Sequence, residues 1–547
     1  MKHVSYNRVS PSPQWIERLS ELLHQLVEES ARRFPSLPAI SHKRQSLDYE
    51  SFLDRVNRAA RGLATLGLKR GERIGIYLEK RLETVVAIFS ATAAGCAFVP
   101  INPVLKPRQV GYIMRDCNVR LLITSRQRAT DLEEEIQSCQ DLRWIVIAEG
   151  DAPKFAFSSV ATLAWHELAT AGETGHPARV IDTDMAAILY TSGSTGNPKG
   201  VVLSHRNLVA GAKSVSQYLE NTSADRILAI LPLSFDAGLS QLTTAFAVGA
   251  KVVLQNYLLP RDAIRTCAEE QITGITGVPP LWMQLADLDW PEGASKSVRY
   301  FANTGGHMPR ATLDRLRKVL PAAKPYLMYG LTEAFRSTYL DPAEVDRRPD
   351  SIGKAIPNAE ISVVRPNGEL CEPDEPGELV HRGALVAMGY WSDPERTAER
   401  YRPAPGQPSG ICLPEIAVWS GDMVRRDAEG FLYFIGRRDE MIKTSGYRVS
   451  PTEVEEIIYS SGLVGAAAAI GVPHSRLGQA IVVVASAPAG IRLNPEVLLA
   501  HCARAMPAYM VPLRIVERAD LPRNPNGKID RKRLADEFVE LFQQEGS

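Results

Sequence analysis

The feature that most constrains this chain is an alternation of two kinds of segment from about residue 20 to residue 270. Segments with helical hydrophobic spacing alternate with short apolar runs rich in β-branched residues, such as "RIGIYL", "AFVPI", "RLLIT", "WIVIA" and "KVVLQ". This alternation is typical of largely parallel strands joined by helices. The sequence therefore predicts an α/β fold with mixed and parallel sheets and flanking helices in a large N-terminal domain.

Two changes of pattern divide the rest of the chain. Between residues 351 and 435, strand-like runs are broken by Asn-Gly, Pro-Gly and Glu-Gly turns, which predicts a β subdomain. A fresh α/β pattern follows "GRRDEMIKTSGYRVS" and lasts about a hundred residues, enough for a small domain. We therefore predict an N-terminal domain over residues 1–437 and a small α+β C-terminal domain over residues 438–547.

Composition narrows the class of protein. With 547 residues the chain exceeds the size of a single core, and Lys plus Arg and Asp plus Glu both number 63. This balance does not favour a nucleic acid or an anionic membrane as partner. The seven cysteines are scattered without a CxxC pair, which indicates neither a disulfide framework nor a zinc cluster. Because no signal peptide or long apolar span is evident, we expect a cytoplasmic protein.

The segment "YTSGSTGNPKG", residues 190–200, is the first candidate site. It lies between strand-like "AAILY" and a helix whose start signal is Ser204, with a further short strand, "GVVLS", between them. Small residues, hydroxyl groups and Lys199 suit an anion nest that holds phosphate. The segment is not a P-loop, because Pro198 and Gly200 stand where that motif needs Gly and Ser or Thr. Taken alone, it equally fits a solvated Gly/Ser turn.

This loop resembles the phosphate-binding signature of the adenylate-forming superfamily, which includes acyl-CoA synthetases, luciferases and the adenylation domains of nonribosomal peptide synthetases. Three more segments are similar to the superfamily's motifs and follow in its order: "YGLTE" (329–333), "SGDMVRRDAEGFLYFIGRRDEMIKTSGYRVSPTEVE" (420–455) and "NPNGKIDRKRL" (524–534). Together they cover nearly the whole chain. The resemblance implies an AMP-binding enzyme with a large N-terminal domain and a small, mobile C-terminal one.

The resemblance also implies which residues bind ATP and Mg²⁺. Thr332 would contact the α-phosphate and Glu333 would bind Mg²⁺, a hard cation suited to carboxylate oxygen. Taken alone, "YGLTE" also fits a strand end followed by a helix cap. Asp422 and Arg437 would bind the ribose, and glycines of "NTGGHMP" would approach the adenine. The full set of nucleotide-binding residues is Thr191, Ser192, Gly193, Ser194, Thr195, Gly196, Lys199, Gly305, Gly306, Tyr329, Asp422 and Arg437.

Four residues toward the C-terminus carry the implied catalytic cycle. By resemblance, Lys528 would bridge the substrate carboxylate and the α-phosphate during adenylation, although a lone lysine is ordinarily solvated surface. Asp439 would be the hinge about which the C-terminal domain turns to a second, thioester-forming pose. In that pose Lys443 would face the acyl site, and Gly446 would leave room for a pantetheine arm.

Asp236 in "LPLSFDAGLSQ" bears on the choice of acid. Its context resembles the amino-acid-activating branch of the superfamily, in which an aspartate pairs with the α-ammonium of the substrate. A carboxylate buried in so apolar a segment needs a partner, and a substrate amine would provide one. The alternative is that Asp236 caps the following helix. By resemblance the acyl pocket is lined by Asp236, Leu239, Ser240, Thr244, Val278, Asn303, Gly305, Tyr329 and Ala334.

The acceptor and the exact branch stay open. "KTSGYRVSPTEVEE" and "LVAMGYW" look like free-standing acyl-CoA synthetases, and the chain is also similar to exosortase-associated acyl-CoA ligases and to proline-type carrier-protein ligases. We expect a small carboxylic acid, an amino acid first, to be activated by ATP and passed to CoA or to the phosphopantetheine of a separate carrier protein. Alternatives are an acyl-CoA synthetase for a non-amino acid, an inactive binding protein of the same fold, and a luciferase-like oxygenase.

Overall fold

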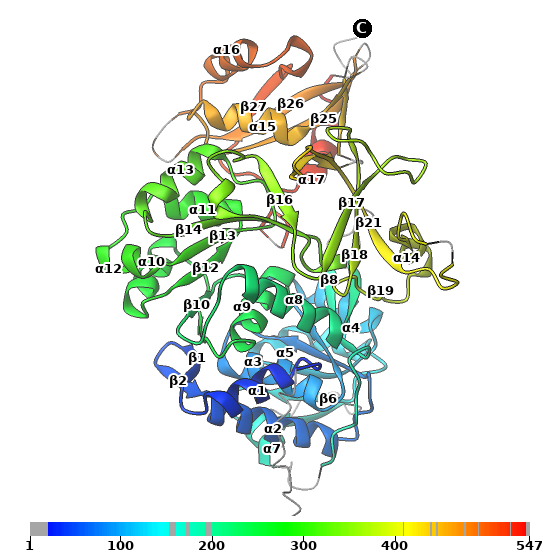
Figure 1. The fold of residues 1–547 in the computed structure, drawn as a ribbon. Helices are drawn as coiled ribbons and strands as arrows, with labels where there is room; N and C mark the ends of the chain where they lie inside the picture. The colour runs from blue at the N-terminus through cyan, green and yellow to red at the C-terminus, as the bar shows by residue number, and fades with distance from the viewer. Residues whose placement is uncertain are drawn as a thin grey trace, which may run out of the picture.

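The structure, a computed structural model, describes residues 20–151, 160–170, 175–191, 198–408, 410–437, 440–444, 447–474, 477–488, 490, 492–525 and 527–542, with the side chains of 447 and 448 excepted. Three β-sheets organise these residues (Figure 1). Two belong to the N-terminal part, and the third lies in the C-terminal part at the top of the view. The predicted α/β class is confirmed, with parallel sheets first, an antiparallel region next and a small α+β unit last.

The largest sheet joins a parallel half to an antiparallel half. Its parallel strands bring neighbouring carboxyl ends to one edge, while the strands after residue 350 pair antiparallel, as the turn-rich sequence predicts. In spatial order the strands are β17 (Ala359–Val364), β18 (Gly377–Gly383), β21 (Ile416–Arg426), β22 (Leu432–Arg437), β16 (Ser351–Ala355), β15 (Thr338–Leu340), β14 (Lys324–Tyr329), β13 (Tyr300–Asn303), β12 (Gly274–Gly277), β10 (Arg226–Ala229), β11 (Lys251–Leu254), β1 (Pro38–His42) and β2 (Gln45–Asp48), and β20 (Tyr401–Pro403) pairs with β21.

The second sheet carries the glycine-rich segment. β8 and β9 pair antiparallel with Thr191 opposite Lys199, and the predicted "GVVLS" strand is therefore found. Ser204 caps the helix that follows, because its hydroxyl oxygen accepts a hydrogen bond from the Asn207 N–H. The order is β19 (Gly389–Tyr390), β9 (Lys199–Ser204), β8 (Met185–Thr191), β4 (Ala97–Pro100), β3 (Arg73–Tyr77), β5 (Val119–Thr124), β6 (Trp144–Ile147) and β7 (Ala161–Ala164).

Helices cover the faces of these two sheets and fill the space between them (Figure 1). No helix in the described part of the chain is long and apolar enough to span a membrane. The N-terminal helices are α1 (Gln25–Arg33), α2 (Tyr49–Thr65), α3 (Leu82–Ala93), α4 (Pro107–Asp116), α5 (Arg126–Asp131), α6 (Glu133–Gln137), α7 (Trp165–Thr170), α8 (His205–Tyr218), α9 (Asp236–Phe246), α10 (Pro260–Glu269), α11 (Pro279–Ala286), α12 (Glu292–Ser297), α13 (Arg310–Val319) and α14 (Pro394–Arg400), with short 3₁₀ turns η2 (Thr332–Ala334) and η3 (Pro342–Glu344).

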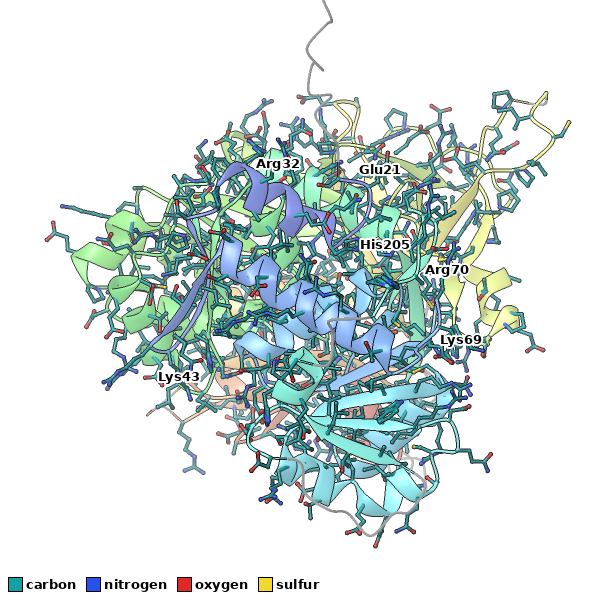
Figure 2. The ribbon with its side chains drawn as sticks, turned by 90° about the horizontal axis from the view of Figure 1, so that it is seen from below. Glu21, Arg32, Lys43, Lys69, Arg70 and His205 are labelled. Atoms are coloured by element: carbon teal, nitrogen blue, oxygen red, sulfur yellow. The ribbon has the colours of Figure 1, made fainter. Side chains whose placement is uncertain are left out.

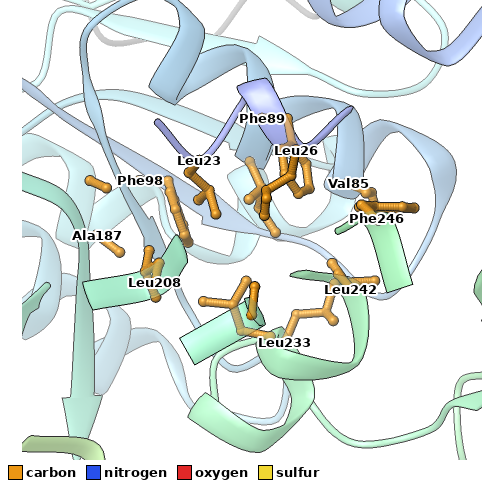
Figure 3. Close-up of a cluster of buried hydrophobic side chains, with 14 of the residues drawn as sticks. Leu23, Leu26, Val85, Phe89, Phe98, Ala187, Leu208, Leu233, Leu242 and Phe246 are labelled. Atoms are coloured by element: carbon orange, nitrogen blue, oxygen red, sulfur yellow. The ribbon is translucent and has the colours of Figure 1, made fainter. Parts of the chain in front are cut away.

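The main hydrophobic core lies between the sheets. Phe89 of α3 and Phe246 of α9 meet edge to face, 5.3 Å between ring centroids, in the cluster drawn in Figure 3. Leu23 and Leu26 close this cluster from the N-terminal segment. The Leu23 N–H also donates a hydrogen bond to Nδ1 of buried His205, which fixes the start of the described chain against α8. Figure 2 labels His205 and, from the N-terminal segment, Glu21. The core therefore holds α9, which carries candidate pocket residues, rigidly in place.

The C-terminal part has its own sheet and its own core clusters. Its helix α15 packs against α13 and β22 of the preceding part. The predicted boundary after residue 437 stays a prediction. The strands are β24 (Tyr447–Val449), β23 (Ile442–Thr444), β26 (Gly478–Ser486), β25 (Ala466–His474) and β27 (Arg514–Glu517), and the helices are α15 (Pro451–Ser460), α16 (Pro495–Ala505), η4 (Ala508–Met510) and α17 (Arg531–Glu537).

Candidate active site

The candidate residues gather at the carboxyl ends of four neighbouring parallel strands. In α/β sheets this edge is where ligands bind, because loops that leave adjacent strands converge there. β10 leads to Asp236, β12 to Val278, β13 to Asn303 and β14 to Tyr329. The strand order therefore brings these predicted site residues together at one edge of the sheet. Ser192, Gly193, Ser194, Thr195, Gly196, Asp439 and Gly446 lie outside the described residues.

A cluster of Glu333, Lys199 and Tyr390 forms the first part of the site. Oε1 of Glu333 accepts a hydrogen bond from the Tyr390 hydroxyl at 2.6 Å and lies 3.3 Å from Nζ of Lys199. Nζ of Lys199 also lies 2.7 Å from the same hydroxyl. Oγ1 of Thr191, the register partner of Lys199, is buried and has no hydrogen-bond partner among the described residues. The end of β9 thus presents a cation beside the Glu333 carboxylate, and the facing end of β8 presents a buried hydroxyl group.

Glu333 has the properties of a Mg²⁺ ligand. Burial alone would raise its pKa, but Lys199 and the Tyr390 hydroxyl outweigh burial, and the net shift of the pKa is downward. Among the described residues no group of three or more His, Cys, Asp or Glu is arranged to hold a metal ion. An ionised lone carboxylate suits Mg²⁺, which commonly takes one or two carboxylates and completes its shell with phosphate oxygens and water. The residues present therefore fit this cofactor.

We expect Tyr390→Phe to weaken ATP use selectively. The hydroxyl joins Glu333 to Lys199, so its loss frees both side chains to move and removes one charge-assisted hydrogen bond. The KM for MgATP should rise by about tenfold, equivalent to about 1.4 kcal/mol, with a smaller change in the KM for the acid. Steady-state kinetics with each substrate varied in turn measure this split, and Tyr433→Phe, which removes a hydroxyl that bonds Asp427, is the matched control. An unchanged KM for MgATP would show that Tyr390 has no such role.

Asp422, Tyr329 and Arg437 form the second part of the site. The Tyr329 hydroxyl donates to Oδ2 of Asp422 at 2.5 Å, and Nε of Arg437 lies 3.4 Å from Oδ1. Burial raises the pKa of Asp422, while Arg437 and the Tyr329 hydroxyl oppose the rise. Oδ1 is buried without a hydrogen-bond partner among the described residues. An acceptor left open in this way suits a hydroxyl-bearing ligand such as a ribose.

Lys528 reaches this edge of the sheet from the C-terminal part of the chain. A Cβ atom built on Gly305 would lie 3.4 Å from Cε of Lys528, 3.3 Å from Val278 and 3.6 Å from Phe235. Gly305 has a φ of +76°, a conformation that a residue with a side chain rarely adopts, and the glycine leaves the path of the lysine open. Desolvation lowers the pKa of Lys528, and the nearby Asp236 carboxylate opposes this shift. The residue as a whole keeps exposed surface.

Three hydrogen bonds hold the C-terminal part in this pose. Nδ2 of Asn102 donates to the carbonyl of Pro525 at 2.9 Å, three residues before Lys528. On the other side of α15, Glu456 lies 2.9 Å from Nε2 of His307 and accepts the backbone N–H of Arg310 at 3.2 Å. With these contacts made, Lys528 of the C-terminal part lies close enough to Asp236 of the N-terminal part for the two charges to interact. The arrangement brings a cation from the C-terminal part to the candidate acyl site.

Asp236 pairs with a side chain of the protein, whereas the sequence predicted a substrate amine as its partner. Nη1 of Arg336 donates to Oδ2 of Asp236 at 2.8 Å, and both side chains are buried, 2% and 4% exposed. The protein itself therefore supplies the counter-ion that the sequence argument assigned to a substrate amine. The helix-cap alternative is wrong, because α9 begins at Asp236 with Phe235 as its cap residue and no capping side chain. Oδ1 of Asp236 still has no hydrogen-bond partner among the described residues.

Two side chains fix the segment between β10 and Asp236. Nζ of Lys80 donates to the carbonyls of Ile230 at 2.7 Å and Leu231 at 3.1 Å. Oε1 of Gln241 accepts the Leu231 N–H at 3.2 Å. Gly238 is required here, since a Cβ atom would lie 1.9 Å from the carbonyl oxygen of Pro232. These contacts hold the backbone before Asp236 in one place.

The buried Lys80 predicts a pH-dependent stability. Burial lowers its pKa from 10.5 to about 7, so above pH 7 the folded state is neutral at Lys80 while the unfolded chain still binds the proton. Stability relative to Lys80→Met should therefore rise as pH increases from about 7 toward 10, by at most about 1.4 kcal/mol per pH unit. Urea unfolding of both proteins at pH 7, 8 and 9 measures the difference. A difference independent of pH would contradict a neutral Lys80, and Lys324→Met, at an exposed lysine paired with Glu220, is the control.

The other predicted site residues lie in the following places. Leu239, Ser240, Val278, Asn303 and Ala334 are all buried near this edge, and Oδ1 of Asn303 has no hydrogen-bond partner among the described residues. Thr332 begins η2 beside Glu333, and Gly306 accepts Nδ2 of Asn303 through its carbonyl at 2.9 Å. Lys443 is exposed on β23 with its N–H donated to Gln479, and no described hydrogen bond or ion pair joins it to Glu333 or Asp422. Its assigned role in a second pose stays a prediction.

Sequence reasoning missed Arg336 and Tyr390. Arg336 follows Glu333 by three residues, and an arginine directly after "YGLTEAF" was an available signal of a buried cation. Phe335 between them has a φ of +58°, an uncommon conformation for a bulky residue that the surrounding core must maintain. Tyr390 lies in "AMGYW", and its position opposite Glu333 depends on the pairing of β19 with β9, which no local pattern indicates.

Comparison with known proteins places this chain among relatives of two kinds. It is 28% identical to bacitracin synthase 3 of Bacillus licheniformis over 94% of this chain, which spans only 8% of that synthase. It is also 28% identical to a long-chain-fatty-acid–CoA ligase of Salmonella typhimurium over 94% of both chains. The chain thus spans less than a tenth of the first relative and nearly all of the second.

Solved structures share the fold. ATP-bound MatB from Rhodopseudomonas palustris superposes with a TM-score of 0.81 at 22% identity, over 95% of this chain and 99% of MatB. The anthranilate CoA ligase AuaEII in complex with anthranoyl-AMP gives a TM-score of 0.84 at 23% identity, over 95% and 97%. MenE from Bacillus subtilis was solved with ATP and magnesium ion, and it gives a TM-score of 0.78 at 24% identity, over 93% and 98%.

Family membership follows from matches along the sequence itself. Residues 27–391 match the AMP-binding enzyme family, and residues 453–528 match the AMP-binding enzyme C-terminal domain. The first match contains Asp236, Val278, Asn303 and Tyr329, and the second contains Lys528. The chain belongs to the AMP-binding enzyme family, within the adenylate-forming superfamily that includes the AMP-forming acid–thiol ligases.

Proposed function

We propose that this protein activates a carboxylic acid, an amino acid first, as an acyl-adenylate and passes the acyl group to a thiol. The observation that supports it best is the placement of Lys528 beside Gly305, Val278 and Phe235, close to Asp236. A cation at that point can hold a substrate carboxylate and the α-phosphate together, which neutralises two anions that would otherwise repel. The Glu333 and Asp422 clusters then suit the phosphate end and the ribose of ATP.

The first step balances without an external oxidant or reductant. A carboxylate oxygen of the acid bonds to the α-phosphorus, and the bond from that phosphorus to the bridging oxygen of pyrophosphate breaks. Thr191 and Lys199, with the loop between them, would bind the leaving phosphates, and Thr332 would contact the α-phosphate. Mg²⁺ on Glu333 would neutralise negative charge on the phosphates. Catalysis is thus mainly positioning and electrostatics.

The second step transfers the acyl group to sulfur. A thiolate attacks the acyl carbon and AMP leaves. We propose that the thiol belongs to CoA or to the phosphopantetheine of a separate carrier protein. We propose that Asp439 is the hinge for the intervening rotation and that Lys443 and Gly446 face the acyl site afterwards. The hydrogen bonds of Asn102 and Glu456 to the opposite domain must then break.

An amine-bearing acid is proposed because of Asp236. Its Oδ1 atom is buried and lacks a hydrogen-bond partner among the described residues, and an α-ammonium would provide one. Because Arg336 already neutralises the carboxylate, the amine is not required for charge balance. This observation supports a second candidate, an acyl-CoA synthetase for a non-amino acid, as does the likeness to a fatty-acid–CoA ligase over 94% of both chains.

Exchange of labelled pyrophosphate into ATP, across a panel of amino, aryl and fatty acids, tests the proposal. We expect exchange that depends on a small acid. Asp236→Asn keeps the shape of the side chain and should reduce exchange with an amino acid about tenfold or more relative to the same acid without its amine. Equal losses with both acids would remove the amine from the proposal, and an absence of exchange with every acid would overturn the adenylation step.

A further inference from the structure

Arg336 is a buried arginine that uses only one of its three nitrogen atoms. Its Nη1 donates to Oδ2 of Asp236 at 2.8 Å and to the carbonyl of Phe335 at 2.7 Å. Nε and Nη2 are buried, and neither has a hydrogen-bond partner among the described residues. The residue as a whole is 1% exposed. Buried guanidinium nitrogens are ordinarily paired, because an unpaired buried charge-bearing donor is costly.

The unused edge of Arg336 has a specific shape. The N–H bonds of Nε and Nη2 lie in the guanidinium plane on the same edge. Together they form the fork that receives both oxygens of a carboxylate. Asp236 does not take this edge, since it contacts Nη1. The fork is therefore open to one more acceptor, and a carboxylate is the group that satisfies both of its N–H bonds at once.

A small cavity lies against Arg336. Its volume is about 10 Å³, which is close to the space that one water molecule needs. Its wall is largely apolar, from Val215, Leu219, Ile227, Ala237 and Met328, and the residues that contribute polar groups are Ser240, Gln241, Thr244, Thr276, Tyr300 and Arg336. Ser240 and Thr244 were already expected to line the acyl pocket. The cavity as it stands has room for one water molecule and excludes a long alkyl chain. A substrate carboxylate would reach the fork only after the surrounding side chains move apart.

Charge balance selects the kind of acid. Asp236 and Arg336 cancel each other, so a carboxylate on the Arg336 fork adds one negative charge in a buried place. An α-ammonium on Oδ1 of Asp236 would restore neutrality. Building on the proposed function, we infer that the substrate carries a second carboxylate that binds Nε and Nη2 of Arg336, and that it is an acidic α-amino acid.

The test compares acids that differ by one group. Aspartate and glutamate carry both groups, succinate and glutarate lack the amine, and 2-aminobutyrate and norvaline lack the second carboxylate. In pyrophosphate exchange, kcat/KM for the acidic amino acids should exceed that for the apolar ones about 100-fold or more, because an apolar side chain leaves the fork unpaired. A panel in which 2-aminobutyrate or norvaline matches or exceeds aspartate and glutamate would overturn the inference.

Arg336→Lys tests the residue itself. Lysine keeps a positive charge opposite Asp236 but has no planar fork, so the preference for the acidic amino acid should fall at least about tenfold with the KM for ATP unchanged. Arg348→Lys is the matched control, since Arg348 is another buried arginine that pairs with Glu344 and Asp427. If Arg336→Lys leaves the preference unchanged, the pair is structural and its fork binds water only. The double variant Arg336→Met with Asp236→Asn removes both charges together and should lose the preference even if the lysine variant folds poorly.

The outcomes separate this inference from the proposed function. If succinate and glutarate are the best substrates, the second carboxylate is supported and the amine of the proposed function is wrong. If no acid supports exchange, the proposed adenylation is wrong. The binding of aspartate, measured by thermal unfolding, then tests the role of Arg336 separately. Aspartate should raise the midpoint of thermal unfolding of the wild-type protein, and this rise should be lost in Arg336→Lys. A rise that survives the substitution would contradict the role of Arg336.

Discussion

Lys528→Ala is expected to lower acid-dependent pyrophosphate exchange by about 10³-fold, equal to about 4 kcal/mol of transition-state stabilisation, while ATP still binds. The reason is geometric. Lys528 lies beside Gly305 and near Asp236, whereas the Glu333 and Asp422 clusters that suit ATP belong to the opposite domain and stay intact. Exchange rates measure the first effect, and the ATP-induced shift of thermal unfolding measures the second.

The matched control is Lys318→Ala, an exposed lysine on α13. It removes the same side chain from the surface and should leave exchange within about twofold of the wild-type rate. Near-normal exchange in Lys528→Ala would mean that the pose seen here is not the adenylating one. Loss of ATP binding together with exchange would show that the lysine acts on the nucleotide rather than on the reacting carboxylate.

Glu333→Gln has the second largest expected effect. Glutamine keeps the length of the side chain and can still accept the Tyr390 hydroxyl, but it lacks the negative charge that suits Mg²⁺ and that faces Lys199. We expect exchange to fall by about 10²-fold and the Mg²⁺ concentration for half-maximal rate to rise. A Mg²⁺ titration of the exchange rate, at saturating ATP and acid, measures both changes.

Glu399→Gln on α14 provides the comparison, because Glu399 is exposed and the substitution likewise removes one negative charge. It should leave the Mg²⁺ dependence unchanged. If Glu333→Gln lowers the rate with no change in the Mg²⁺ requirement, Glu333 serves only to hold Lys199 and Tyr390. The metal would then have to be bound by other groups.

Sequence alone predicted the sheet architecture because local patterns carry it. Apolar runs separated by helical segments predicted the parallel strands, and the Ser204 start signal predicted the beginning of α8, as found. The gathering of Asp236, Val278, Asn303 and Tyr329 at one edge follows from the strand order. Local patterns do not predict that order, because it is set by long-range strand pairing. These residues were assigned to one site from the motif resemblance alone.

The partner of Asp236 could not be predicted in the same way. The physical premise, that a buried carboxylate needs a counter-ion, was correct, but the counter-ion lies a hundred positions away at Arg336. The identity of the partner depends on how β14 and η2 turn back over α9. Tyr390 is a similar case, since its contact with Glu333 spans 57 positions and two sheets. Such contacts between segments far apart in the sequence are the part of the site that local pattern does not reveal.

The central claim is that the chain converts an acid and ATP into an acyl-adenylate. A single-turnover reaction with ATP, Mg²⁺ and the best acid of the panel, without any thiol, followed by mass spectrometry of the protein-bound products, tests it most directly. The account predicts a species with the mass of the acid plus AMP less one water, and one equivalent of pyrophosphate. Formation of ADP and phosphate, or no consumption of ATP with any acid, would contradict it.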